Sequence, residues 1–254
     1  MHPTLFKIGF LEIHTYGVFV ALGFFVGFKM LLFYGKKSSF SPALIETLTF
    51  WVFIFSLIGA RLFYVLISWQ EFAGNPSDIF KIWQGGLVFW GGFLGGAITG
   101  IIFSIKNKMP LWKLADVFAP ALAIGHALGR IGCFFAGCCY GKKTDSFLGV
   151  VFPENCLAPT GVKLIPAQLL SSGLLSILFL ILVIFWKRKK FDGQIFLIYS
   201  VLFSVGRFFI EFLRGDFRGN LILGITPTQI ISVTIFIVSI IVWKKLYRTK
   251  TKSV

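Results

Sequence analysis

The stretch at residues 125–141, GHALGRIGCFFAGCCYG, begins inside an apolar run, yet it carries a histidine, an arginine and three of the four cysteines of the chain. An arginine at the centre of a bilayer costs roughly 2.5–3.5 kcal/mol on insertion scales, so such a residue faces the protein interior and usually marks function. Two properties of the chain therefore matter first: whether the surrounding apolar runs cross a membrane, and which chemistry these side chains serve.

The composition of the whole chain indicates an integral membrane protein. Of its 254 residues, 56% are hydrophobic, 18% are aromatic and only 14% are charged, and the mean hydropathy is +0.84. Soluble domains average about 45–50% apolar and about 25% charged residues. We therefore expect a single membrane domain over residues 1–254, with an all-α fold of about seven transmembrane helices.

Apolar runs long enough to cross a bilayer recur along the chain. The expected spans are 14–34, 43–68, 85–105, 114–136, 166–186, 193–213 and 227–246. The third span has glycines four residues apart, a spacing that lets helix backbones approach closely. These pairs are Gly91 with Gly95 and Gly92 with Gly96. The long connection at 137–165 follows directly on the cysteine motif.

The distribution of lysine and arginine predicts the orientation in the membrane. With the N-terminus outside, the inward-facing segments hold fifteen basic residues and the outward-facing segments hold seven. Cytoplasmic loops carry the basic excess, so we expect the N-terminus outside and the C-terminus inside. The net charge of +15 is mostly this signal, and we expect the bilayer as a partner and no nucleic acid. The connection at 137–165 then faces the exterior.

Three arginines lie within the expected spans: Arg61, Arg130 and Arg207. Glu211 follows Arg207 by four residues on the same helical face, and Arg214 follows three residues later. Arg207 and Glu211 can neutralise each other and thereby only stabilise the bundle. Three buried arginines against one clear carboxylate still leave a positive surplus, and a guanidinium binds phosphate oxygens two at a time. The sequence therefore predicts a site for a phosphate ester.

The four cysteines leave several interpretations open. The C-x4-C-C spacing of Cys133, Cys138 and Cys139 is not a standard zinc pattern, so we expect no metal and no cofactor. A disulfide between Cys156 and either Cys138 or Cys139 is compatible with an oxidising exterior. A turn without a disulfide is the simpler structural interpretation. The chain has no C-x-x-C motif to support a thiol-redox relay.

Several motifs together resemble the prolipoprotein diacylglyceryl transferase family. GHALGRIGCFFAGCCYGKKT, from residue 125, resembles the family signature in a cysteine-containing form, and GRFFIEFLRGD at 206–216 resembles the Arg-x-x-x-Glu-x-x-Arg ending of its sixth span. Further elements match in the same order along most of the chain: TYGVFVALGFFVG (15–27), GARLFYVL (59–66), GGLVFWGGFLGG (85–96) and IPAQL (165–169).

The resemblance implies an enzyme of the bacterial cytoplasmic membrane that performs the first step of lipoprotein maturation. Such an enzyme transfers the diacylglyceryl group of phosphatidylglycerol to the lipobox cysteine thiol of a prolipoprotein and releases glycerol phosphate. Arg130 and Arg207 then hold the phosphate and stabilise its developing charge, and Glu211 orients Arg207. The resemblance also implies a lipid-accessible central cavity. The further head-group residues that it implies are Arg61, Tyr64, Tyr16, Arg214 and Gly132.

The sequence departs from the family pattern at positions that matter for catalysis. The histidine that the family usually has before the third-span Gly-Gly is Trp90, and the usual asparagine and glutamate of the signature are Cys133 and Cys138. These departures leave two alternatives open. One is a paralogue with a different thiol acceptor or lipid donor, and the other is a non-enzymatic lipid-binding or thiol-redox membrane protein.

His126 is the candidate general base in the absence of the family histidine. It lies four residues before Arg130 and therefore on the same helical face. Its unperturbed pKa of about 6.5 suits proton transfer near neutral pH. A buried histidine with a purely structural hydrogen bond is the other interpretation. Cys138 or Cys139 as a nucleophile that carries the diacylglyceryl group is a further, less favoured one.

Overall fold

The computed structural model describes residues 3–8, 11–216 and 225–252, and within them seven long apolar helices. They are α1 (Thr15–Lys37), α2 (Pro42–Ile67), α4 (Phe89–Lys106), α5 (Leu111–Ala136), α6 (Ala167–Trp186), α7 (Gln194–Leu213) and α8 (Pro227–Lys252). Each is long and apolar enough to cross a membrane. The predicted all-α multi-pass fold is therefore confirmed, whereas the orientation, the central cavity and the single domain remain predictions.

Short elements fill the connections. Strands β1 (Thr4–Ile8) and β2 (Leu11–His14) pair antiparallel ahead of α1, and β3 (Val150–Val151) pairs antiparallel with β4 (Lys163–Leu164) in the connection that follows α5. Between α2 and α4 the chain forms three short helical segments. These are α3 (Trp69–Phe72), η1 (Pro76–Phe80) and η2 (Ile82–Gln84).

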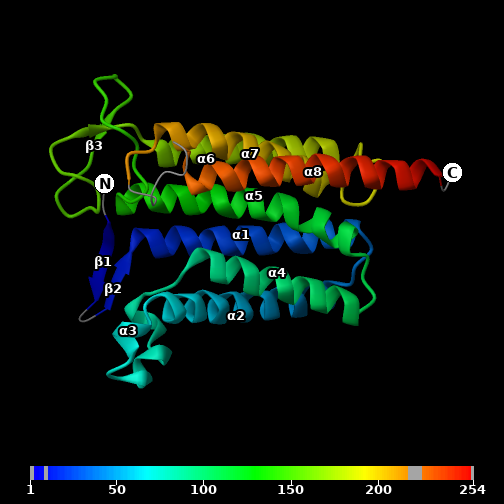
Figure 1. Cartoon of the computed structure of the whole chain (residues 1–254), viewed down its shortest axis with the longest axis horizontal. Coiled ribbons are helices and arrows are strands. Elements are labelled where there is room, and N and C mark those ends of the chain that lie inside the picture. The colour runs from blue at the N-terminus through cyan, green and yellow to red at the C-terminus, as the bar shows by residue number, and fades with distance from the viewer. Residues whose placement is uncertain (1–2, 9–10, 217–224, 253–254) are drawn as a thin grey trace. The chain divides into compact units, whose positions relative to one another are not determined.

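The chain forms two compact units, and the smaller one, Leu32–Leu114, contains the glycine-rich helix. In this unit α2 and α4 lie side by side (Figure 1). A side chain added at Gly91 would collide with the backbone oxygen of Gly59, and one added at Gly95 would collide with that of Phe55. The two helix backbones are therefore in direct contact, which is the close packing that the four-residue glycine spacing predicted.

The larger unit comprises Met1–Leu31 and Ala115–Val254. Here α5, α6, α7 and α8 run side by side (Figure 1), and small residues of α5 face large ones of α6 and α7. The core of this packing consists of Ala119, Ala123, Ala127, Leu175, Leu178, Leu182 and Ile195. The first half of α1 also packs on α5, because the backbones of Gly23 and Gly125 touch.

A buried carboxylate fixes the start of α7 against α5. The Asp116 side chain is fully buried and accepts hydrogen bonds from the backbone N–H groups of Gly193, at 2.8 Å, and Phe196, at 2.9 Å. Lys189 pairs with the same carboxylate at 3.0 Å. An anion at a helix N-terminus is stabilised by the unsatisfied N–H groups and the helix dipole. Asp116 is therefore bound at the first turn of α7, fourteen residues before Arg130.

Candidate functional site

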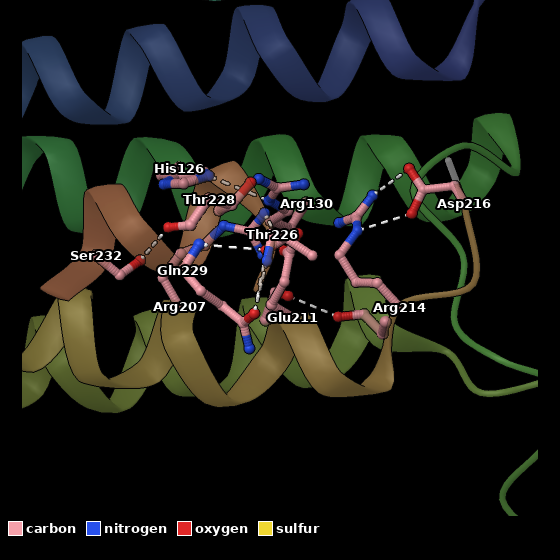
Figure 2. A network of polar contacts seen from close by, with 12 residues as sticks. His126, Arg130, Arg207, Glu211, Arg214, Asp216, Thr226, Thr228, Gln229 and Ser232 are labelled. Carbon is pink, nitrogen blue, oxygen red and sulfur yellow. Dashed lines mark hydrogen bonds and ion pairs between the residues drawn. The ribbon is translucent and has the colours of Figure 1, made fainter. Parts of the chain in front are cut away.

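Arg130 and His126 lie on adjacent turns of α5 and are bonded to each other. Arg130 Nε donates a hydrogen bond to His126 Nε2 at 3.1 Å (Figure 2). An imidazole nitrogen that accepts carries no proton, so His126 is neutral with its proton on Nδ1. Among the described residues, the two terminal amino groups of the half-buried Arg130 have no hydrogen-bond or ion-pair partner. Arg130 therefore retains the fork of N–H donors with which a guanidinium binds phosphate.

Arg207 is held by the carboxylate one turn further along α7. Arg207 Nη2 lies 2.7 Å from Glu211 Oε2, and only 2% of the Glu211 side chain is exposed (Figure 2). The contact is an ion pair and not an aligned hydrogen bond, since this oxygen has no hydrogen-bond partner of good geometry. A buried carboxylate needs a cation close by. The pair that the sequence predicted is therefore present, with Glu211 fixing the direction of Arg207.

Arg214 lies directly after α7 and makes a bidentate pair. Its Nε and Nη2 donate to the two carboxylate oxygens of Asp216 at 2.8 and 2.7 Å (Figure 2). Two parallel bonds of this kind fix both position and plane of the guanidinium. The segment around Arg214 also pairs with Gly141, and Gly215 N donates to Tyr140 O. The end of α7 is thereby tied to the turn that contains the cysteines.

The cysteine turn is shaped by two residues in the left-handed backbone region. Gly137 has φ +70° and Cys139 has φ +63°, so the chain reverses direction directly after α5. As a result the sulfur atoms of Cys133, Cys138 and Cys139 all lie within 4.8 Å of one another. Gln168 of α6 holds the turn by donating from Nε2 to Cys138 O at 2.7 Å. The turn thus brings Cys133 together with Cys138 and Cys139, which lie five and six residues later in the sequence.

Cys156 does not belong to this group of three sulfurs. Its Sγ contacts the backbone oxygen of Phe135 at 3.8 Å. All four cysteines are among the described residues, and no disulfide joins them. The disulfide of Cys156 with Cys138 or Cys139, which the sequence left open, is therefore not formed in this structure.

Cys139 and Cys156 differ in thiol acidity. Hydrogen bonds from Cys133 and Cys138, with a further interaction from Arg214, hold the pKa of Cys139 well below its usual range. Burial instead raises the pKa of Cys156. The thiolate is the nucleophilic and metal-binding form of cysteine. Cys139 is thus the more acidic of the two thiols.

Tyr16 lies next to the signature, as its place in the predicted set implies. A side chain added at Gly132 would lie 3.2 Å from the Tyr16 backbone oxygen and 3.3 Å from its ring. The Tyr16 hydroxyl is within electrostatic range of Arg130 and of the three clustered thiols. Gly132 therefore gives α1 the room to bring this hydroxyl towards them.

Arg61 and Tyr64 belong to the smaller unit, and their polar groups serve the segment that follows α2. The Tyr64 hydroxyl donates to Glu71 at 2.8 Å. Arg61 is 7% exposed, and among the described residues its guanidinium donates only to backbone oxygens. These are the oxygens of Asp78, Ile79, Lys81, Gly85 and Gly86, at 2.6–3.5 Å. All five donors of Arg61 are engaged, so in this arrangement none is left for a lipid head group.

Three polar residues near the site were not predicted from the sequence. Asp216 pairs with Arg214, and Gln168 holds the cysteine turn. The third is Gln229, which accepts from Thr226 N at 3.0 Å while its own N–H donates to Thr226 Oγ1 at 3.3 Å (Figure 2). This reciprocal pair is a capping box that begins α8, and the T-x-x-Q pattern was its signal in the sequence.

Two hollows on the larger unit lie away from Arg130 and Arg207. Two grooves run beside the C-terminal half of α8, one along Ile241 and Lys244 and the other along Trp243 and Arg188. Arg130 and Arg207 line neither groove. The grooves therefore do not represent the lipid-accessible central cavity, which stays a prediction.

Comparison with known proteins agrees with the motifs over nearly the whole chain. The family model described as Prolipoprotein diacylglyceryl transferase matches residues 3–244. The chain is 36% identical over 243 residues to phosphatidylglycerol–prolipoprotein diacylglyceryl transferase 2 of Clostridium perfringens, covering 96% of this chain and 94% of that protein. It is 34% identical to the enzyme of Clostridium tetani, with 96% and 97% covered, and 33% identical to that of Listeria welshimeri, with 97% and 91% covered. The chain therefore belongs to the prolipoprotein diacylglyceryl transferase family.

Proposed function

We propose that this protein transfers the diacylglyceryl group of phosphatidylglycerol to the lipobox cysteine thiol of prolipoproteins and releases glycerol phosphate. This is the first step of bacterial lipoprotein maturation. The observation that carries the proposal is the guanidinium of Arg130, whose terminal amino groups have no partner among the described residues. Membership of the family supports the choice of donor and acceptor.

The reaction places its charge where these arginines can stabilise it. The acceptor sulfur forms a bond to the terminal glyceryl carbon while the bond from that carbon to a phosphate oxygen breaks. Negative charge then builds on the departing phosphate ester. Arg130 binds two of its oxygens, and Arg207, fixed by Glu211, offers a second cation. Donors oriented before the reaction are worth most, because they need no reorganisation as the charge develops.

His126 has a positioning role in this arrangement. Its Nε2 accepts from Arg130 Nε and so fixes the plane of the guanidinium. The base role predicted from the sequence requires that Nε2 first leaves Arg130, because a nitrogen engaged as an acceptor cannot also take a proton. We therefore infer that the main role of His126 is to position Arg130 and that proton transfer is secondary.

The proposal includes a location. The seven apolar helices cross the bacterial cytoplasmic membrane, with the N-terminus outside and the C-terminus inside. The basic excess of the inward-facing segments supports this orientation. The cysteine turn and the connection at 137–165 then face the side on which secreted prolipoproteins emerge.

The test is release of glycerol phosphate from phosphatidylglycerol by the purified protein. A lipobox peptide is added in one reaction, and the same peptide with serine in place of its cysteine is the control. Release that depends on the cysteine supports the proposal. Release that occurs in the absence of both peptides, or only when a small thiol is added, supports a paralogue with another acceptor. Absence of release from folded protein that binds the lipid contradicts the proposed function and supports a paralogue with another donor or a non-catalytic role.

A further inference from the structure

Three sulfur atoms gather at the C-terminal end of α5. Cys133 lies in the last turn of the helix, and Cys138 and Cys139 lie in the turn that follows, with all three sulfurs within 4.8 Å of one another. A Zn–S bond measures about 2.3 Å, so two thiolates on one tetrahedral zinc ion lie about 3.8 Å apart. The three sulfurs are therefore close enough together for one ion to bind all of them.

Backbone contacts hold this arrangement. Cys139 adopts φ +63°, a conformation that costs a non-glycine residue energy and persists only where its surroundings impose it. Here Gln168 holds the carbonyl of Cys138, and the backbone around Arg214 pairs with that of Gly141. Such imposed strain is common at ligand-binding and active sites.

We propose that Cys133, Cys138 and Cys139 form a trithiolate zinc site whose fourth position is open to the thiol of the acceptor substrate. Among the described residues, no histidine, carboxylate or further cysteine joins the three sulfurs. Three protein ligands and one open position are typical of catalytic zinc sites. The second half of this inference rests on the proposed function, because it takes the acceptor to be a cysteine.

The charges around the cluster suit such a site. Three thiolates and one Zn²⁺ carry a net charge of minus one. Arg214 interacts with the sulfur of Cys139, and Arg130 acts electrostatically on Cys133. Asp216 fixes the Arg214 guanidinium by two bonds. The spacing of the cysteines along the chain argued against a metal, but the left-handed turn brings the sulfurs together regardless of that spacing.

A zinc-bound thiol needs no separate general base to remove its proton. An ordinary thiol has a pKa of about 8.5, and coordination to zinc removes its proton. His126, the candidate base of this chain, has its Nε2 engaged by Arg130. On binding, the acceptor thiol loses its proton to solvent. Its sulfur then forms the C–S bond, the C–O bond to phosphate breaks, and that electron pair leaves with glycerol phosphate.

The competing occupant of the cluster is a disulfide. Its sulfurs must approach to about 2.05 Å, and its formation needs an oxidant that accepts two electrons. The two states differ in mass and in metal content, so one preparation distinguishes them.

The first experiment counts zinc in the full-length protein, purified in detergent with zinc present and then dialysed. We expect about one ion per chain, and about a tenfold loss in C133S, C138S and C139S. The matched control is C156S, which removes a cysteine outside the cluster and keeps its zinc. Size exclusion and thermal unfolding confirm that each variant is folded. Zinc-free wild-type protein, equal zinc in all variants, or an intact mass that shows a disulfide in the cluster overturns the site.

The second experiment tests whether the open metal position binds the substrate thiol, and it does not require turnover. Co²⁺ replaces zinc, and its thiolate charge-transfer absorption is recorded with no phosphatidylglycerol present. We expect a lipobox peptide to change the spectrum and its serine counterpart to leave it unchanged. Equal spectra with both peptides overturn thiol binding, whatever the enzyme's activity. Full peptide-dependent release of glycerol phosphate by zinc-free enzyme also overturns it, while leaving the proposed function intact.

Discussion

Arg61 and Arg130 both lie within helices long enough to span a membrane, but they make opposite use of the same side chain. Arg61 directs every N–H donor to backbone oxygens of the segment after α2. Among the described residues, Arg130 engages only Nε, with His126. A saturated guanidinium holds a segment of chain in place, whereas one with an available fork can bind an anion. The comparison shows that an arginine in an apolar helix marks a role, and that its partners determine which role.

The largest expected effect comes from removing the available fork. Arg130→Gln should lower kcat/KM for glycerol phosphate release by roughly 10²–10³, because charge on the phosphate loses its stabilising donors. Arg130→Lys keeps the charge without the fork and should recover only part of this loss. Lys143→Gln, which removes a cation from an exposed position, is the control. If R130Q is as active as K143Q, the assignment of Arg130 fails.

Replacement of the saturated arginine should act on stability. Arg61→Gln leaves several carbonyls without a donor and should cost about 3 kcal/mol, seen as a lower Tm and faster proteolysis between residues 68 and 88. Arg188→Gln, at an exposed position, should change neither. If R61Q is stable but no longer binds phosphatidylglycerol, Arg61 is not structural and has the head-group role that the family resemblance implied.

His126 offers a sharper test of how Arg130 is positioned. The side-chain oxygen of glutamine can accept a hydrogen bond from Arg130 Nε, whereas alanine cannot. We expect His126→Gln to stay within about tenfold of the wild-type kcat and His126→Ala to fall further, since a charged hydrogen bond is worth about 1.5–3 kcal/mol. If both variants lose activity equally, together with the acidic limb of the pH–rate profile, His126 is the base.

The smallest expected effect is a difference between Cys139 and Cys156 in how their alkylation rates depend on pH. In metal-free protein, alkylation of Cys139 should change little between about pH 8 and pH 6, because a lowered pKa keeps it a thiolate. Alkylation of Cys156 should fall about tenfold per pH unit, because a raised pKa leaves a shrinking thiolate fraction. Peptide mass spectrometry measures both rates. Arg214→Gln should weaken the difference, and an unchanged profile in R214Q would show that Arg214 does not contribute.

Hydrophobicity alone predicted the seven helices, because a run of apolar residues in a bilayer must satisfy its own backbone hydrogen bonds. The expected span 193–213 corresponds to α7 at Gln194–Leu213. The third span was placed four residues too early. Gly85 and Gly86 have φ +90° and +71°, and their carbonyls bind Arg61, so α4 begins only at Phe89.

Parts of the site depend on contacts that no local pattern encodes. The pairing of Arg207 with Glu211 followed from their four-residue spacing. The same spacing placed His126 and Arg130 on one helical face, but their hydrogen bond was not predicted. The gathering of the thiols was not predicted either, because it depends on a left-handed Cys139 held by distant segments. The partners of Arg61 were equally hidden, since they are backbone oxygens and carry no side-chain signature.

The Asp116 contact fixes the position of Arg130 relative to α7. Both helices are fixed to each other at one end, where Asp116 binds the first turn of α7. From there Arg130 is fourteen residues along α5, about 21 Å at 1.5 Å per residue. A one-residue insertion between Asp116 and Arg130 would advance the guanidinium by about 1.5 Å and rotate it by about 100°. The length of this segment is therefore under tighter constraint than the identity of most residues within it.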